Sequence, residues 1–363
     1  MAGASSTRAA RERKGTQIAK ILRGAWRANP PPPDFGEPDL EEMSSLLKAS
    51  LTAALAWWKI RHSSLAQSDV SAHLRAQYVA HAIRSAHATH RVYQYVAALR
   101  AHNIEPIVFK GWAVFSHYAE AGLRPPGDVD LAVAPHDAAR ATKILYELGA
   151  TPVDVDVHPG LSDSAHAAYI PNSSWDQVLE RTRIKLVGDL PVRVLDPEDA
   201  FQVVCIHSAR HSYARPIWLC DVAAMLETRP ADFDWTRALS RPPYASWIAA
   251  AILLAHHLLD AKIENTPLAA RRERMPQWLV RDVLGRWAQP YLIQKMVHTS
   301  ILEIWRTPAR WGDAVRARVP NRLEATLAHY GALNEPFLAR YQMLSAVEQF
   351  WRFTRRGGVP LSE

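Results

Sequence analysis

Apolar positions recur at helical spacing in the first hundred residues of the chain. One such segment covers residues 18–26, and the prolines at 30–33 end it because proline lacks an amide donor. A second region, residues 40–102, is rich in Ala and Leu and predicts three helices, with Trp57-Trp58 in the first. We expect residues 1–15 to form a flexible basic arm and residues 31–39 to form a linker.

Short apolar runs replace the helical pattern near residue 104. Runs of this length that are bounded by Pro, Gly and charged residues are typical of β-strands. Helices are expected between the first three runs, over residues 111–121 and 136–148, with Gly149 as a C-cap. The predicted strands are 104–109, 129–133, 152–158, 183–187 and 191–195.

The pattern becomes helical again at Pro197, which stands at a favourable first helical position after Asp196. Further helices fit residues 216–227, 235–241, 244–261, 275–288, 290–305, 320–331 and 336–354. The chain therefore predicts a small core of strands and helices that is enclosed by helical regions on both sides in sequence.

Composition and charge narrow the class of protein. Hydrophobic residues make up 48% of the 363 residues, which is enough for a sizeable core. The formal net charge is +7, and residues 1–30, with seven basic residues and one acid, carry +6 of it. A body that is nearly neutral does not offer a long phosphate-tracking groove, so we expect no nucleic-acid partner.

Several other classes lack their signatures. No apolar run is long enough to span a bilayer, and the N-terminus has no apolar segment of the kind found in a signal peptide. Cys205 and Cys220 fit neither a disulfide framework nor a metal knuckle, so we expect a reducing cytoplasm and no membrane partner. Walker A and GxGxxG motifs are absent, which excludes the P-loop and Rossmann nucleotide sites.

The most informative residues are carboxylates in two predicted strands. Asp128 and Asp130 lie two apart, and so do Asp154 and Asp156, with His158 after them. Side chains two apart on a strand share a face. Carboxylates on one face repel each other unless a cation lies between them, and hard oxygen ligands suit Mg²⁺ with a polyphosphate. The alternative is a set of solvated acids at a turn.

These residues form part of a longer motif. A strand is followed by Lys110-Gly111, then by Arg-Pro-x-x-Asp-x-Asp over 124–130, and later by Asp-x-His at 156–158. This order resembles the uncharacterised bacterial nucleotidyltransferase family of the polymerase-β-like superfold. Downstream, the similarity includes residues 194–199, 205–207, 218–221 and 234–235, so that it covers roughly residues 85–260. The family usually has Met where this chain has Pro126.

The resemblance implies an α+β fold and a set of site residues. The mixed-sheet nucleotidyltransferase core would span residues 103–196. Before it we expect an arm, a short helix and a linker over residues 1–39, and a helical region over residues 40–102. After it we expect a helical domain over residues 197–363. Asp128, Asp130 and Asp156 would hold two Mg²⁺ ions, with Asp154 as the alternative third ligand. Lys110, Gly111, Arg124 and His158 would bind the nucleotide, although Arg124 can equally anchor its loop.

Other candidate residues have simpler interpretations. His207 and His211 lie four apart on a helix, but no Glu follows His207, so packing is favoured over a metal. Asp221 is expected to be buried and paired, or to point into the nucleotide cleft. The thirteen Trp residues are spread along the chain and indicate core positions.

Two functions follow from these predictions. The first is an Mg²⁺-dependent nucleotidyltransferase that moves an NMP to a hydroxyl or phosphate of a small-molecule or peptide acceptor. AMP is the favoured group, with ATP as its donor. The alternative is a non-catalytic module that binds nucleotide or nucleic acid with its basic arm. An intact set of three carboxylates favours catalysis, because such acids repel phosphate unless metal ions intervene.

Overall fold

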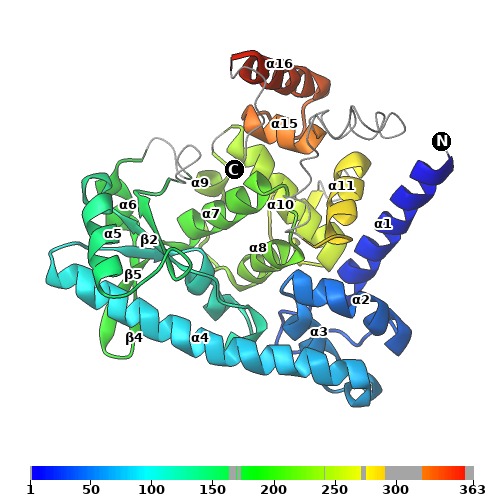
Figure 1. The fold of residues 1–363 in the computed structure, drawn as a ribbon, viewed down its shortest axis with the longest axis horizontal. Helices are drawn as coiled ribbons and strands as arrows, with labels where there is room; N and C mark the ends of the chain where they lie inside the picture. Colours follow the sequence, from blue (N-terminus) through cyan, green and yellow to red (C-terminus); the bar gives the residue numbers. More distant parts are fainter. Residues whose placement is uncertain are drawn as a thin grey trace.

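A computed structural model describes residues 2–162, 169, 173–240, 242–270, 275–290 and 321–355. One mixed sheet lies at one side of the molecule, and helices from the N- and C-terminal parts of the chain make up the rest (Figure 1). The expected α+β class is confirmed by this arrangement. The predicted helix over 290–305 lies outside the described residues.

The sheet has five strands in the order β3-β2-β1-β5-β4. β1 is antiparallel to β2 and parallel to β5, β2 is parallel to β3, and β4 is antiparallel to β5. The carboxyl ends of β1 and β5 therefore meet the amino ends of β2 and β3 at one edge of the sheet. The strand bounds are β1 Ile107–Phe109, β2 Val129–Val133, β3 Val155–Pro159, β4 Arg183–Val187 and β5 Leu190–Val194.

One face of the sheet is covered by a long helix, α4 (Asp69–Ala101), together with α5 (Ala138–Glu147). Val92, Val96 and Leu99 of α4 are fully buried against alternate strand residues such as Val108 and Leu131. The remaining part of α4 extends past the sheet to the N-terminal helices along the lower edge of the view (Figure 1). The period of two along each strand thus places one set of valines and leucines on this face.

The opposite face packs against the C-terminal helices. Ile107, Phe109 and Ala132 join a core that also contains buried residues of the N-terminal helices. The N-terminal helices are α1 Ala2–Leu22, α2 Glu37–Ala49 and α3 Ala53–Ile60. The later helices are α6 Trp175–Arg181, α7 Pro197–Arg210, α8 Pro216–Thr228, α9 Trp235–Ala238, α10 Tyr244–Leu259, α11 Gln277–Trp287, α15 Arg322–Ala328 and α16 Ala339–Arg355.

The N-terminal basic segment differs from the prediction. Residues expected to form a flexible arm belong to α1, which continues without a break to Leu22. Ala, Arg, Lys and Glu are strong helix formers, and Arg8 pairs with Glu12 one turn later at 3.4 Å. At Gly15 the helix lies so close to α11 that an added Cβ would be 2.1 Å from the Leu284 carbonyl oxygen. The segment is therefore a packed helix.

Two other local predictions need correction. Trp57 and Trp58 lie in α3, the second helix of their region, and residues 111–117 form a 3₁₀ helix, η2 (Gly111–His117). β3 begins only at Val155, so Val153, which the predicted strand 152–158 includes, lies outside it and is 82% exposed. In the described part of the chain, no helix combines the length and apolar character needed to cross a membrane.

Candidate active site

Three neighbouring strands bring the predicted site residues to one edge of the sheet. In the register of β1, β2 and β3, Phe109 lies opposite Asp130, and Asp130 lies opposite Asp156. Lys110 follows β1 directly, and Asp128 directly precedes β2. The ladder thus aligns residues that come from separate strands and are up to 47 positions apart in sequence, from Phe109 to Asp156. Their side chains share the face that packs toward the C-terminal helices.

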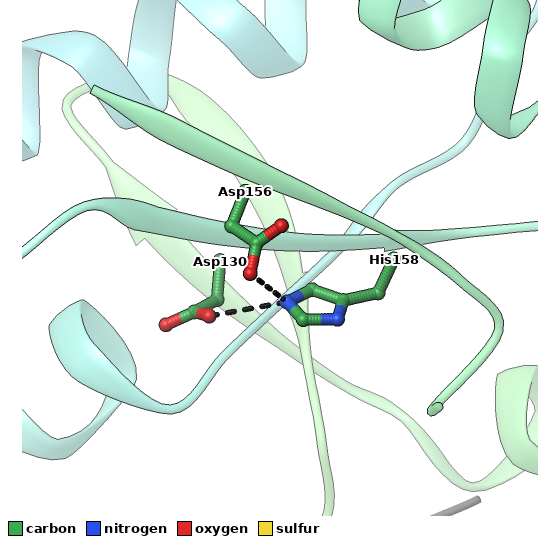
Figure 2. A group of neighbouring side chains, drawn as sticks. All are labelled: Asp130, Asp156 and His158. Carbon is green, nitrogen blue, oxygen red and sulfur yellow. Dashed lines mark hydrogen bonds and ion pairs between the residues drawn. The ribbon is translucent and has the colours of Figure 1, made fainter. Parts of the chain in front are cut away.

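The carboxylates and His158 form a compact cluster (Figure 2). His158 Nε2 lies 3.2 Å from Asp130 Oδ1 and 3.0 Å from Asp156 Oδ2. His158 Nδ1 lies 2.9 Å from the Ser162 carbonyl oxygen, which fixes the plane of the ring. One ligand atom from each of the three residues lies within 4.8 Å of the others. The set therefore converges on a single point in the way a cation site requires.

Lys110 completes the charge balance of the cluster. Its Nζ is 2.7 Å from Asp130 Oδ1 and 3.4 Å from His158 Nε2, and only 10% of its side chain is exposed. Its backbone has a φ of 53°, which is uncommon for a residue other than glycine. Such conformations gather at functional sites, where the surrounding structure holds them. Here the turn between β1 and η2 directs the ammonium group at Asp130.

The charges within the cluster shift one another's pKa values. Burial and the neighbouring Asp130 raise the pKa of Asp128 to about 6. Burial alone would lower the pKa of His158, but its bonds to Asp130 and Asp156 raise that pKa to about 9. The bond from His158 in turn lowers the pKa of Asp156. The carboxylates are therefore crowded together, and Lys110 and His158 offset part of their mutual repulsion.

A cleft of about 360 Å³ opens over these residues. One wall is formed by Lys110, Gly111, the loop 124–128 and the carboxylates, and the other by α7 and α8. On the helical wall the rings of His207, His211 and Trp218 contact one another, with centroids 4.5 to 5.3 Å apart. The cleft therefore has an acidic side and an aromatic side.

Arg124 anchors the loop that leads to Asp128. Its guanidinium donates to both carboxylate oxygens of Asp221 at 3.2 and 3.1 Å, and Tyr118 donates to the same carboxylate at 2.7 Å. Asp221 is buried and paired, and it also lines the cleft, so both of the alternatives expected for this residue describe it. A Cβ added at Gly111 would lie 3.4 Å from the Asp128 carbonyl oxygen and 3.5 Å from Asp130 Oδ2. Gly111 thus keeps free the space next to the carboxylates.

Asp154 lies outside the cluster. Its carboxylate accepts from the Thr151 amide and hydroxyl at 3.1 and 2.6 Å, and it pairs with Arg91 at 2.9 Å. These bonds form a turn before β3, so the face shared with Asp156 in an extended strand does not exist there. Of the two alternatives for a third carboxylate, the geometry brings only Asp156 to Asp130.

The aromatic wall was not predicted as part of the site. Trp218 is buried, as its prediction as a core residue implies, whereas His207 and His211 are only partly buried and line the cleft. Their position opposite the carboxylates follows from the packing of α7 and α8 on the sheet, which no local pattern encodes. The signal nearest to it was the match at 205–207 and 218–221, which contains two of the three residues.

The donor set fits a hard divalent cation. Asp128, Asp130 and Asp156 offer carboxylate oxygens, which Mg²⁺ prefers, and His158 is held between two of them. Among the described residues, Lys110 and His158 are the cations in direct contact with these carboxylates, and Arg124 lies near enough to Asp130 for the two charges to interact. The carboxylates and His158 thus form a candidate site for a metal ion.

Comparison with known families agrees with this geometry. A sequence model of a family described as uncharacterised nucleotidyltransferase matches residues 36–260, which includes the sheet, the cleft and helices α2 to α10. No curated protein and no solved structure shows a significant match to the chain. The match covers well over half of the 363 residues. It starts about fifty residues before residue 85, where the resemblance to the family was expected to begin. The chain belongs to this nucleotidyltransferase family.

Proposed function

We propose that the protein transfers a nucleoside monophosphate, AMP from ATP, to a hydroxyl or phosphate oxygen of a small-molecule or peptide acceptor. The acceptor oxygen forms a bond to the α-phosphorus while the bond to the bridging oxygen of pyrophosphate breaks, and the acceptor proton leaves. The observation that carries this proposal is the convergence of Asp128, Asp130 and Asp156 in one cleft of a nucleotidyltransferase.

The carboxylates are proposed to hold two Mg²⁺ ions. When bound, these ions would supply the positive charge that neutralises the phosphates and activates the acceptor oxygen. Asp128 and Asp130 would position the triphosphate, and Asp156 and Asp130 the acceptor oxygen. For Asp130 to bind a metal ion, Lys110 and His158 would both have to give up their contacts with its Oδ1, and Lys110 would then be available to a phosphate oxygen.

The other residues of the cleft would position the nucleotide. Gly111 would leave room for a phosphate beside the carboxylates, because it has no Cβ. Trp218 and His211 offer ring faces on the opposite wall, where a nucleobase can stack. Arg124 acts through Asp221 and its loop, and therefore holds Asp128 in place.

Incubation of the purified chain with each of the four NTPs, labelled at the α-phosphorus, tests the proposal. A cell extract supplies acceptors, and mass analysis identifies what gains an NMP. We expect Mg²⁺-dependent labelling, with ATP as the best donor. Labelling that persists in excess EDTA would contradict the metal-dependent mechanism, and preference for another NTP would correct the donor.

A further inference from the structure

A second, smaller cavity of about 140 Å³ lies beside the cleft. It is enclosed by the ends of β4 and β5, by η2, and by α7 with the end of α8. Lys110, Val114 and Val204 line both hollows, so the two are separated by little more than these side chains. A molecule in the smaller cavity would therefore lie next to the reaction centre.

Cationic side chains surround this cavity. Arg183, Lys185 and Arg229 line it. His117 lines it too, but burial, together with the nearby Lys185, lowers the pKa of this imidazole to about 4, so the ring is neutral near pH 7. The described lining residues include no aspartate or glutamate. By contrast, two of the cations that line the cleft pair with a carboxylate: Lys110, which also lines the cavity, with Asp130, and Arg124 with Asp221.

The described contacts of these cations involve neutral groups. Lys185 Nζ lies 4.8 Å from the centre of the Trp112 ring. Arg229 donates to the carbonyl oxygens of Leu226 and Asn265. Burial lowers the pKa of Lys185 and of Arg229. Partly buried cations without a carboxylate partner leave a surplus of positive charge, which an anion in the cavity would compensate.

The floor of the cavity is apolar. Phe201 and Phe233 are buried there with their rings 5.7 Å apart, and Met225 lies beside them. A triphosphate tail has no apolar part that could use such a floor. A compound with an anionic group on a short carbon body would use both features, and the volume is comparable to about five water molecules.

We propose that this cavity holds the anionic end of the acceptor, a phosphate or carboxylate group carried on an apolar body. The proposal rests on the proposed function, because it names the class of molecule that receives the NMP. The acceptor would enter from the side of β4 and α8, whereas the nucleotide would occupy the cleft. Lys185 and Arg229 are then specificity-determining residues of the acceptor site.

Binding of simple probes to the full chain tests this proposal. Butyl phosphate, inorganic phosphate and butylammonium are titrated calorimetrically into the wild type, Lys185→Gln and Arg183→Gln. We expect butyl phosphate to bind the wild type more tightly than inorganic phosphate, because the apolar floor adds to the charge. Its affinity should fall about tenfold in Lys185→Gln, and less in the more exposed Arg183→Gln. Butylammonium should not bind.

A matched control is Lys143→Gln, which removes the same charge from the exposed face of α5 and should leave all affinities within about twofold. Binding of ATP with Mg²⁺ should change by less than about twofold in Lys185→Gln. A parallel loss of ATP affinity would mean that the cavity serves the triphosphate, and would overturn the proposal. Equal binding of butyl phosphate by Lys185→Gln and the wild type, or no binding by the wild type, would overturn it too.

The variant Asp128→Asn separates the two proposals. It should lose NMP transfer and still bind butyl phosphate, because Asp128 lines the cleft and not the cavity. If Asp128→Asn retained transfer, the proposed catalytic role would fail while the cavity result stood.

Discussion

The cleft and the cavity lie on either side of Lys110 and carry opposite charges. The cleft has an excess of carboxylates, and the cavity has an excess of cations. In the cleft, Asp128, Asp130 and Asp156 outnumber the two cations that contact them, Lys110 and His158. In the cavity, Arg183, Lys185 and Arg229 meet no described carboxylate. An excess of one sign in a partly buried site predicts a ligand of the opposite sign. The cleft should therefore take up metal ions and the cavity an anion.

The largest expected effect concerns the acidic side of this comparison. Replacing Asp128 by Asn removes a proposed metal ligand and should lower NMP transfer by roughly a thousandfold. Asp154→Asn is the matched control, because it neutralises a carboxylate that bonds Thr151 and Arg91 outside the cluster. Initial rates with α-labelled ATP measure both. Comparable losses in the two variants would mean that the position of Asp128 in the cleft is irrelevant.

The second-largest expected effect is on stability, when the ion pair between Arg124 and Asp221 is broken. Asp221→Asn leaves the buried Arg124 guanidinium without its carboxylate, and should lower the free energy of unfolding by roughly 3 kcal/mol. Urea unfolding measures the change. Glu147→Gln, which removes the exposed partner of Lys143 on α5, should change it by less than about 0.5 kcal/mol. Equal losses in both variants would refute the anchoring role of Asp221.

Filling the space beside the carboxylates should have a smaller effect. The Cβ of Gly111→Ala would make contacts of 3.4 to 3.7 Å, which the fold tolerates. It would occupy the place proposed for a phosphate, so ATP affinity should fall about tenfold with little change in melting temperature. Calorimetric titration with ATP and Mg²⁺ measures the affinity. An unchanged affinity would place the phosphates elsewhere in the cleft.

The smallest expected effect is the thermal stabilisation that Mg²⁺ or butyl phosphate produces when it binds. Mg²⁺ at about ten times its Kd should stabilise the EDTA-treated protein by about 1.4 kcal/mol, which corresponds to roughly 2 °C. Asp156→Asn should lose this shift and keep the one produced by butyl phosphate, and Lys185→Gln should show the reverse. Scanning calorimetry records both shifts. Loss of both shifts in either variant would mean that the two hollows are one site.

The sequence predicts the separate parts of this site more completely than their assembly. The five strands and the Asp128–Asp130 pair follow from local alternation, and the structure confirms the strands within three residues at each end. Asp154 and Asp156 could not be distinguished, because the Thr151 turn that removes Asp154 from the strand is a side-chain effect. The helical state of residues 2–15 was not predicted, because it depends partly on the packing of α1 against α11.

The cavity could not be predicted at all. Lys185 and Arg229 are more than forty residues apart in sequence, and they meet only because α8 ends beside the strand that carries Lys185. The sequence does not show whether a cation is paired, because that depends on which carboxylates the fold brings near it. The proposed acceptor site therefore emerges from the structure alone.

The central claim is that the α-phosphorus of the nucleotide moves to an acceptor, and ATP carrying different labels on its α- and γ-phosphorus tests it most directly. After reaction with the wild-type protein, Mg²⁺ and cell extract, we expect the α-label in the acceptor and the γ-label in pyrophosphate. A γ-label in the acceptor, or α-label that never leaves ATP, would contradict the account.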